Sequence, residues 1–526
     1  MNWRMDIYQF QEVMADFCRN RARCLSRTAL WWLVFSTLAS VWWIQKKFGV
    51  PSFNQFLYHF EFGCQGLLTA EYYVLKSFII SNVLLPVLPA WALGSGMIKA
   101  TRKLGFVAPV ACLLLAFACL LNQVSFWHYL RIRNGYDYFS FHYKDPRTVS
   151  LTAKSPRNLV LIYVESLDAT YGDAHLFGRD LLHNLEAPAV HGQSFVRYNQ
   201  APGTGWTMAA MVSTQCGVPL EAVTLYDGND QGGKLKHYLP GGVCLGDVLD
   251  AFGYRNIFMG GAPLDFAGKG KFLKDHHYEN VYGREDWIAE GEKVDEHGWG
   301  LHDDDLFHHA RTELDALEAS GGRFNLTLLT LDSHYSGIES LSNYCARRGA
   351  QNFTDLIECT ADQTAEFIDY IRQKGYLENL DVVVLGDHLA MGNPVIDRLR
   401  SVPERHIFNL FVSKAPPRKT REDILHFDLF PTILDLLGIH VQKGRLALGY
   451  SAFAASSPRP EVGRLEEMRD NLMHPSPLYF HLWTQTNAPP LRLVRRALPS
   501  GAGPRKAYTR SPSLKLASTP KIQVTN

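Results

Sequence analysis

The sequence lacks an excess of charge of either sign. Its 526 residues include 53 Lys and Arg against 52 Asp and Glu, a formal net charge of +1. We therefore expect no nucleic acid as a partner. The length predicts more than one domain. Trp, Leu and Phe gather in the first part of the chain, whereas the remainder has the composition of a soluble protein.

The N-terminal part lacks the apolar core of a signal peptide. Residues 1–28 carry five arginines, and we expect them to form a short interfacial helix on the basic side of a membrane. Charged residues are absent from 29–44, 77–98 and 105–127. These three stretches predict membrane spans within a transmembrane region at 29–127, and Trp pairs mark both ends of the first span.

Basic residues predict the orientation of these spans. The arginines of 1–28 and the basic residues between the second and third spans indicate the cytoplasmic side. Lys46 and Lys47 oppose this assignment weakly, because they would lie on the outer side. Three spans place everything after about residue 128 outside the cytoplasm. The last residues, 492–526, are basic and lack any acidic residue, so we expect a disordered tail.

Continuous apolar runs predict the strands of a soluble domain. Such runs are typical of parallel strands that are buried on both faces. Helical patterns such as 359–374 and 428–437 separate them, and the alternation predicts an α/β domain with a mainly parallel sheet over 158–455. Residues 128–157 would be a connector and 456–491 a C-terminal extension. The apolar runs are 159–164, 324–330, 380–385 and 408–412.

Residues able to bind a metal follow three of these strands. Glu165 ends the first strand, Asp387 and His388 follow the 380–385 strand, and His334 follows the 324–330 strand. Chemistry in such sheets collects at the carboxyl ends of the strands, so these side chains are expected to meet.

A glycine loop contributes a hydroxyl. Thr207 follows Gly203 and Gly205, and apolar residues then recur at helical spacing, so a helix is expected to begin at or just after Thr207. The start of a helix suits a phosphate group. By itself, a Thr in this place is more often a structural cap than a nucleophile. Coordination to a divalent ion would lower the pKa of its hydroxyl and orient it for attack. Together with the strand-end residues it would complete a site for Zn²⁺ or Mn²⁺.

These motifs resemble the alkaline phosphatase/sulfatase superfamily. The segments 158–166, 205–207, 333–335 and 386–388 occur there in the same order and at similar separations. Within the superfamily, the chain resembles the membrane-anchored phosphoglycerol and phosphoethanolamine transferases, which include lipoteichoic acid synthase. The resemblance covers roughly residues 158–450.

The resemblance implies a role for each matching residue. Thr207 would be the nucleophile, and His334 would contact the phosphate or headgroup and take part in catalysis. Lys269 falls where lipoteichoic acid synthase has an arginine that binds phosphoglycerol, and a Lys would bind as a point charge. One divalent ion, Zn²⁺ or Mn²⁺, is implied. Its ligands would be Glu165, Thr207, Asp387 and His388.

The resemblance also implies a reaction. Thr207 would attack the phosphorus of phosphatidylglycerol, release diacylglycerol and form a covalent phospho-threonine, from which an envelope glycan, with a periplasmic glucan favoured, takes the phosphoglycerol. The protein would be a multi-pass inner-membrane enzyme with a periplasmic catalytic domain. A phosphoethanolamine transferase acting on lipid A is the alternative. A sulfatase is disfavoured because the Thr207 loop lacks the Cys/Ser-x-Pro-x-Arg pattern that formylglycine requires. An inactive membrane scaffold is disfavoured because all four presumptive metal-site residues are present.

Other polar residues support weaker expectations. Asp303 to Asp305 predict the acidic first turn of a helix, with a substrate headgroup contact from Asp303 as the alternative role. His276 is expected on a solvated surface. In an oxidising compartment we expect a disulfide between Cys345 and Cys359, and Cys216–Cys244 is a second candidate pair.

Overall fold

The computed structural model divides into two units, which are described separately. Unit 1 holds residues 1–136 and 222–231, and unit 2 holds the rest. The expected tail at 492–526 and all but one of residues 49–75 lie outside the described residues. The structure describes residues 7–48, 53, 76–95, 97, 105–127, 130, 136–186, 192–220, 237–294, 299–334, 341–455, 463–472, 474 and 476–484.

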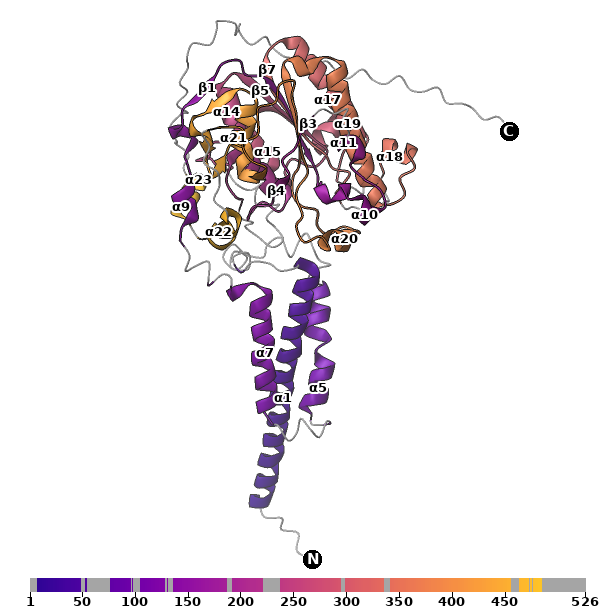
Figure 1. Ribbon diagram of the computed structural model, residues 1–526. Coiled ribbons are helices and arrows are strands. Elements are labelled where there is room, and N and C mark those ends of the chain that lie inside the picture. The colour runs from indigo at the N-terminus through magenta and orange to yellow at the C-terminus, as the bar shows by residue number, and fades with distance from the viewer. Residues whose placement is uncertain are drawn as a thin grey trace, which may run out of the picture. The chain divides into compact units, whose positions relative to one another are not determined.

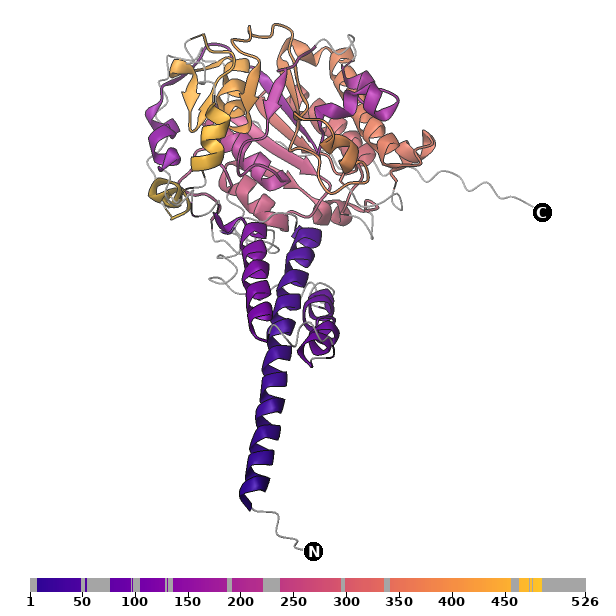
Figure 2. The ribbon, with the colours of Figure 1, turned by 60° about the horizontal axis from the view of Figure 1, so that its bottom comes forward.

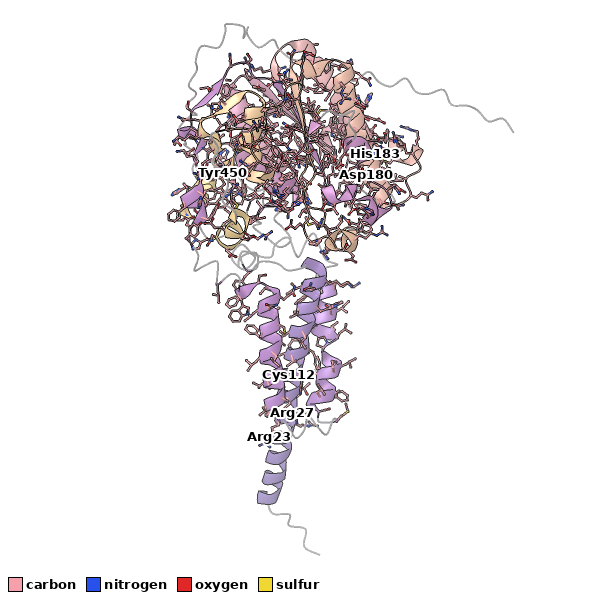
Figure 3. The ribbon with its side chains drawn as sticks, viewed as in Figure 1. Arg23, Arg27, Cys112, Asp180, His183 and Tyr450 are labelled. Atoms are coloured by element: carbon pink, nitrogen blue, oxygen red, sulfur yellow. A yellow bond between two sulfur atoms is a disulfide. The ribbon has the colours of Figure 1, made fainter. Side chains whose placement is uncertain are left out.

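Unit 1 consists of apolar helices. Helix α1 runs without a break over Ile7–Phe48, so the interfacial segment expected at 1–28 continues directly into the first span. Arg23 and Arg27 project from α1 before its apolar half (Figure 3). Two helical stretches are long and apolar enough to cross a membrane, Arg21–Lys46 and Lys76–Gly94, while the apolar helix Val107–Gln123 is shorter.

The helices of unit 1 pack through small and aromatic residues. The second stretch is a π-helix, η1 (Ile79–Leu84), followed by α5 (Val87–Gly94), and α7 is Val107–Gln123. A Cβ at Gly94 would lie 2.2 Å from the Thr28 hydroxyl, so only glycine permits this approach. Trp32 Nε1 donates to the Val83 carbonyl over 2.9 Å, which ties α1 to η1 by a polar contact.

Unit 2 is built on a seven-stranded sheet of order β3-β9-β8-β2-β7-β5-β6. The pairs from β8 to β6 are parallel, and β9 and β3 are joined to that edge by antiparallel pairing. The predicted mainly parallel sheet is therefore confirmed. The strands are β2 (Asn158–Val164), β3 (Gly192–Gln193), β5 (Tyr254–Gly260), β6 (Tyr278–Tyr282), β7 (Arg323–Leu329), β8 (Leu380–Gly386) and β9 (Asn409–Val412).

Helices cover both faces of this sheet (Figures 1 and 2). The apolar faces of α17 (Asp303–Ser320) and α19 (Phe353–Gln373) pack on one side, against alternate residues of β2 and β7. The helix α12 (Thr207–Cys216) contacts the other face, where Tyr163 and Thr214 share a hydrogen bond of 2.6 Å. Both faces of β2 are thus buried, as its continuous apolar run predicts.

Shorter elements complete unit 2. They are α10 (Ala174–Phe177), α11 (His183–Glu186), β4 (Arg197–Asn199), α14 (Leu245–Ala251), α15 (Lys269–Asp275), α16 (Arg284–Glu290), α18 (Asn343–Arg347), α20 (Ile396–Arg400), β10 (Asp423–Leu425), α21 (His426–Leu436), β12 (Arg445–Leu446) and β13 (Gly449–Tyr450).

The prediction of a connector over 128–157 is wrong from residue 137 onward. Helix α9 (Tyr138–His142) buries Tyr138 and Phe139 in unit 2. Strand β1 (Leu151–Ala153) pairs with β11 (Ile439–Val441). The reason lies in the aromatic side chains of this segment, which pack on the C-terminal helix α23 (Pro477–Thr484): the rings of Phe139 and Tyr479 lie 5.3 Å apart.

The C-terminal extension is part of the same folded unit. In α22 (Arg464–Asn471), Arg464 is buried and pairs with Asp428 of α21 at 3.1 Å. A buried carboxylate needs such a partner, and this ion pair therefore fixes α22 on unit 2.

Both expected disulfides are present. Cys345–Cys359 joins α18 to α19, and Cys216–Cys244 joins the end of α12 to the start of α14. Two disulfides in unit 2 are typical of an oxidising compartment.

Candidate functional site

The first component of the site follows β2 directly. Ser166 adopts a left-handed backbone (φ 53°), which turns the chain sharply after Glu165. For a non-glycine residue this conformation costs on the order of 1–2 kcal/mol. Two hydrogen bonds offset that cost: the Ser166 N–H donates to Asp387 Oδ1 and its hydroxyl to Glu165 Oε1, both over 2.7 Å. The turn therefore holds Glu165 toward the end of β8.

The second component follows β8. The parallel register sets Val164 opposite Gly386, so Glu165 and Asp387 leave the sheet side by side. A Cβ at Gly386 would lie 2.0 Å from the Leu167 carbonyl oxygen, so this close approach requires glycine. Asp387 Oδ1 accepts two backbone N–H groups, whereas Oδ2 is buried with no hydrogen-bond partner among the described residues.

The His388 ring is oriented for coordination. Its Nδ1 lies 3.0 Å from the Leu389 carbonyl oxygen and donates to it. Nε2 then faces the carboxylates, 3.5 Å from Glu165 Oε1 and 3.5 Å from Asp387 Oδ2. A backbone acceptor on the far nitrogen is the usual way in which a ligating histidine is fixed.

Thr207 lies beside this cluster. It is the first residue of α12, with Trp206 as the N-cap, so the helix begins where the sequence predicts. Its Oγ1 donates to Glu165 Oε2 over 3.0 Å. The hydroxyl thus combines contact with the carboxylate cluster and the positive end of a helix.

The donor set fits a divalent cation. One ligand atom from each of Glu165, Asp387 and His388 lies within 4.8 Å of the others, and all three residues are buried. Burial and the charge of Glu165 raise the pKa of Asp387 to about 7. Two carboxylates in this position favour an added positive charge. Asp387 Oδ2, which has no hydrogen bond among the described residues, and the mixed oxygen and nitrogen donors suit Zn²⁺ or Mn²⁺.

Comparison with known proteins decides the family. A family model described as Sulfatase matches residues 157–439, more than half of the chain. The chain belongs to the sulfatase family. The matched range contains every residue of the site described above, and it coincides with the sheet of unit 2.

Relatives of this sulfatase-family chain include proteins named phosphoglycerol transferase I. Phosphoglycerol transferase I of Escherichia fergusonii is 35 % identical over 336 residues, which cover 62 % of this chain and 42 % of that protein. Its Salmonella choleraesuis counterpart is 35 % identical over 317 residues, 59 % of this chain and 40 % of that one. The chain therefore spans about two fifths of the length of the curated relatives it matches.

Solved structures give further similarities. An alkaline phosphatase superfamily protein from Vibrio parahaemolyticus has a TM-score of 0.45 and 19 % identity, covering 63 % of this chain and 78 % of that one. The lipoteichoic acid synthase LtaP from Listeria monocytogenes has a TM-score of 0.43 and 17 % identity, covering 59 % and 80 %. The periplasmic domain of EcEptC from Escherichia coli, in complex with Zn, has a TM-score of 0.41 and 13 % identity, covering 59 % and 90 %.

His334 lies at the edge of the sulfatase-family site. Burial would raise the pKa of Glu165, but His388, His334 and Ser166 hold it at about 2, and the Ser333 hydroxyl, next to His334 in the chain, donates to the Glu165 carbonyl oxygen over 2.6 Å. The His334 ring centroid is 4.8 Å from that of Trp299, which in turn lies 5.1 Å from Phe266. Sequence reasoning missed Trp299, because nothing in the sequence around it indicates that it reaches the site.

Lys269 is buried near the same carboxylate. It begins α15, directly after a left-handed turn at Gly268. Burial lowers the pKa of Lys269 to about 8, and the negative charge of Glu165 opposes that change. The ammonium group therefore remains mostly charged at neutral pH.

Asp303 lies behind the site. Its side chain is fully buried, and its two oxygens accept the backbone N–H groups of Leu331 and Asp332 over 2.7 and 3.1 Å. This geometry corrects the expected headgroup contact, because neither oxygen is left facing a substrate. The predicted acidic first turn of α17 is confirmed.

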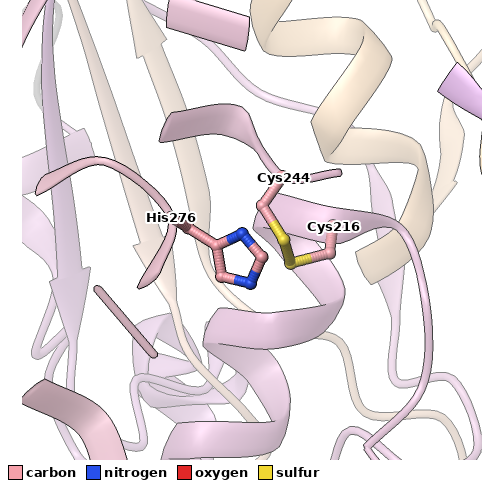
Figure 4. A group of neighbouring side chains, drawn as sticks. All are labelled: Cys216, Cys244 and His276. Carbon is pink, nitrogen blue, oxygen red and sulfur yellow. A yellow bond between two sulfur atoms is a disulfide. The ribbon is translucent and has the colours of Figure 1, made fainter. Parts of the chain in front are cut away.

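The expectation that His276 is solvated is wrong. It is 2 % exposed, and its ring lies beside the Cys216–Cys244 disulfide (Figure 4). Nδ1 pairs with Asp247 over 2.8 Å, and Asp247 also accepts the backbone N–H of Cys244 at the start of α14. The two sulfurs are bonded to each other, so this group supplies no thiolate ligands in the disulfide form.

His426 binds the backbone of Asp387. Burial lowers the pKa of His426 to about 3, so the ring is neutral. Its Nε2 lies 2.8 Å from the Asp387 carbonyl oxygen and donates to it. This bond fixes the backbone of a ligand residue from outside the coordination sphere.

Proposed function

We propose that this chain is a metal-dependent phosphotransferase that moves phosphoglycerol from phosphatidylglycerol to an envelope glycan. The contact between Thr207 Oγ1 and Glu165 Oε2 carries the proposal, because it sets an alcohol inside a cluster of metal-binding groups. The relatives named phosphoglycerol transferase I support the choice of the transferred group.

The ion would be held by Glu165, Thr207, Asp387 and His388. When bound, it lowers the pKa of the Thr207 hydroxyl and offsets the charge of the phosphate. Glu165 orients the hydroxyl through the 3.0 Å hydrogen bond, and the unpaired N–H groups at the start of α12 face the phosphate oxygens.

Two displacements then complete the transfer. Thr207 Oγ1 releases its proton to solvent and bonds to phosphorus, while the bond from phosphorus to the diacylglycerol oxygen breaks. His334 protonates that leaving oxygen, and diacylglycerol departs. An acceptor hydroxyl then attacks the phosphorus and passes its proton to the neutral His334, while the bond from phosphorus to Thr207 Oγ1 breaks and Oγ1 takes a proton from solvent. A periplasmic glucan is the acceptor that we propose.

Unit 1 accounts for access to a lipid donor. Its candidate spans lead us to propose a multi-pass inner-membrane protein, with unit 2 on the periplasmic side. The two disulfides of unit 2 support that side, because disulfides persist in the periplasm.

Intact-protein mass spectrometry tests the reaction directly. The full chain is incubated with Mn²⁺ or Zn²⁺ and with micelles of phosphatidylglycerol or phosphatidylethanolamine. We expect a glycerophosphate-sized mass gain with phosphatidylglycerol and none with phosphatidylethanolamine, and peptide analysis after proteolysis should locate the gain on Thr207. A phosphoethanolamine adduct would identify the alternative transferase, and no adduct from either lipid would refute both.

Lys269 gives a second prediction. Replacing Lys269 with Ala is expected to raise KM for phosphatidylglycerol by about 10–100-fold, because a hydrogen bond to a charged group contributes roughly 1.5–3 kcal/mol. Lys269→Arg is the matched control, since it keeps the positive charge and its KM for phosphatidylglycerol should rise far less. Initial rates of diacylglycerol release measure both variants. An unchanged KM in the Ala variant would remove Lys269 from the donor site.

A further inference from the structure

The acidic first turn of α17 is bonded to the turn that carries His334. Asp303 Oδ1 accepts the Leu331 N–H over 2.7 Å, and Oδ2 accepts the Asp332 N–H over 3.1 Å. In return, Asp332 Oδ2 accepts the Asp303 N–H over 3.2 Å. Each carboxylate thus binds the backbone of the other residue, which locks the end of β7 onto the start of α17.

A histidine completes this arrangement. His302 Nδ1 lies 2.7 Å from Asp332 Oδ1. Burial would lower the pKa of His302, but the charge of Asp332 raises it to about 9. The ring is therefore an imidazolium at neutral pH, and it pairs with one of the two neighbouring carboxylates. Burial and the charge of Asp332 raise the pKa of Asp303, so a positive charge beside these two carboxyl groups stabilises the turn.

The locked turn presents His334 to the metal-binding cluster. The backbone N–H of His334 donates to the Leu331 carbonyl over 2.9 Å, and the Ser333 hydroxyl donates to the Glu165 carbonyl over 2.6 Å. By contrast, the His334 Nδ1 is buried with no hydrogen-bond partner among the described residues. The position of the imidazole thus depends on its backbone and on the ring of Trp299, and the backbone depends on Asp303.

We propose that Asp303 is a positioning residue for His334, acting through its reciprocal bonds with Asp332 and the His302 pair. This role rests on the proposed function of His334 in the transfer step. A displacement of about 1 Å at a reacting group can lower the rate on the order of 100-fold. Fixing this turn therefore keeps the rate of the transfer step high.

A double-mutant cycle tests the proposal. Asp303→Asn keeps the shape of the side chain but replaces one acceptor oxygen with an NH₂ group that faces a backbone N–H. We expect kcat for diacylglycerol release to fall by about 10–100-fold, with KM for phosphatidylglycerol nearly unchanged. In a His334→Ala background the same substitution should have almost no further effect, because its partner is already lost.

Asp304→Asn is the matched control. Asp304 lies in the same helical turn, and its Oδ2 accepts the Tyr344 N–H over 3.0 Å, away from Leu331 and Asp332. Both variants lose an acceptor for a backbone N–H, so a general loss of helix stability would affect them alike. We expect kcat to remain close to that of the unchanged protein in Asp304→Asn.

An activity-free measurement separates this proposal from the proposed function. In ¹⁵N-histidine-labelled protein, the His334 ring signals are assigned by their loss in His334→Ala. We expect them to shift in Asp303→Asn and to stay in place in Asp304→Asn, whether or not phosphatidylglycerol is a donor. Unmoved signals, or equal kcat losses with and without His334, would overturn the positioning role.

Discussion

Replacing Thr207 with Ala is expected to abolish phosphoglycerol transfer, with a fall in kcat on the order of 10⁴–10⁶-fold. The Thr207 hydroxyl is the alcohol oxygen that donates to Glu165 in the cluster, and a methyl group cannot form a bond to phosphorus. Other parts of the site would remain, because Glu165, Asp387 and His388 hold their positions through backbone and Ser166 contacts. Diacylglycerol release and the glycerophosphate adduct measure the loss.

Thr207→Ser is the control for this substitution. It keeps an oxygen at the start of α12 and should retain both adduct and turnover at a reduced rate. Glu165 must also stay in place in the Ala variant, which Zn²⁺ binding by the three remaining ligands, Glu165, Asp387 and His388, would verify. Diacylglycerol release at an undiminished rate from Thr207→Ala would show that another group, or water, attacks the phosphorus.

The metal-binding residues could be predicted because local sequence and sheet register coincide. Strand β2 reads as a continuous apolar run and β8 as an apolar run that only Asp381 interrupts, and Glu165 and Asp387 follow directly after these strands. Parallel pairing of these strands then brings the two carboxylates together without further information. His388 follows from its position next to Asp387.

Contacts between distant segments could not be predicted in this way. Strand β5 interrupts its apolar residues with Arg255 and Asn256, and Asn256 is buried with donors to the Gly246 and His277 carbonyls, so its pattern does not read as a core strand. Trp299 reaches His334 only through the tertiary fold. The same holds for His276, which is buried because Asp247 of α14 binds it from another segment.

The role of Asp303 shows the same limit within a correctly predicted element. Its place in an acidic helical turn is visible in the sequence, since such residues favour the positive end of a helix dipole. Which backbone groups it accepts depends on where β7 ends beside α17. A local pattern can thus predict the element and still leave the partner of its side chain undetermined.

Replacing Asp387 with Asn is expected to remove metal binding and, with it, nearly all transfer. Loss of one buried ligand charge should cost about 3–5 kcal/mol of affinity, more than 100-fold in Kd. In the metal-free protein the same substitution is expected to increase the free energy of unfolding. Asp387 has its pKa raised to about 7 by burial and by Glu165, so its charge is unfavourable to folding as pH rises from about 4 to 7. The neutral Asn escapes that penalty.

Thermal unfolding with and without Zn²⁺ distinguishes these effects. The unchanged protein should gain stability when Zn²⁺ is added, by the linkage between binding and folding, whereas Asp387→Asn should gain almost none. Asp423→Asn serves as the control, because Asp423 is an exposed carboxylate paired with Arg197 and is not among the cluster residues. A Zn²⁺-dependent gain in Asp387→Asn as large as in the control would place the ion elsewhere. The proposal that the ion activates the Thr207 hydroxyl would then be refuted, because the hydrogen bond from Thr207 to Glu165 cannot activate the alcohol without the cation.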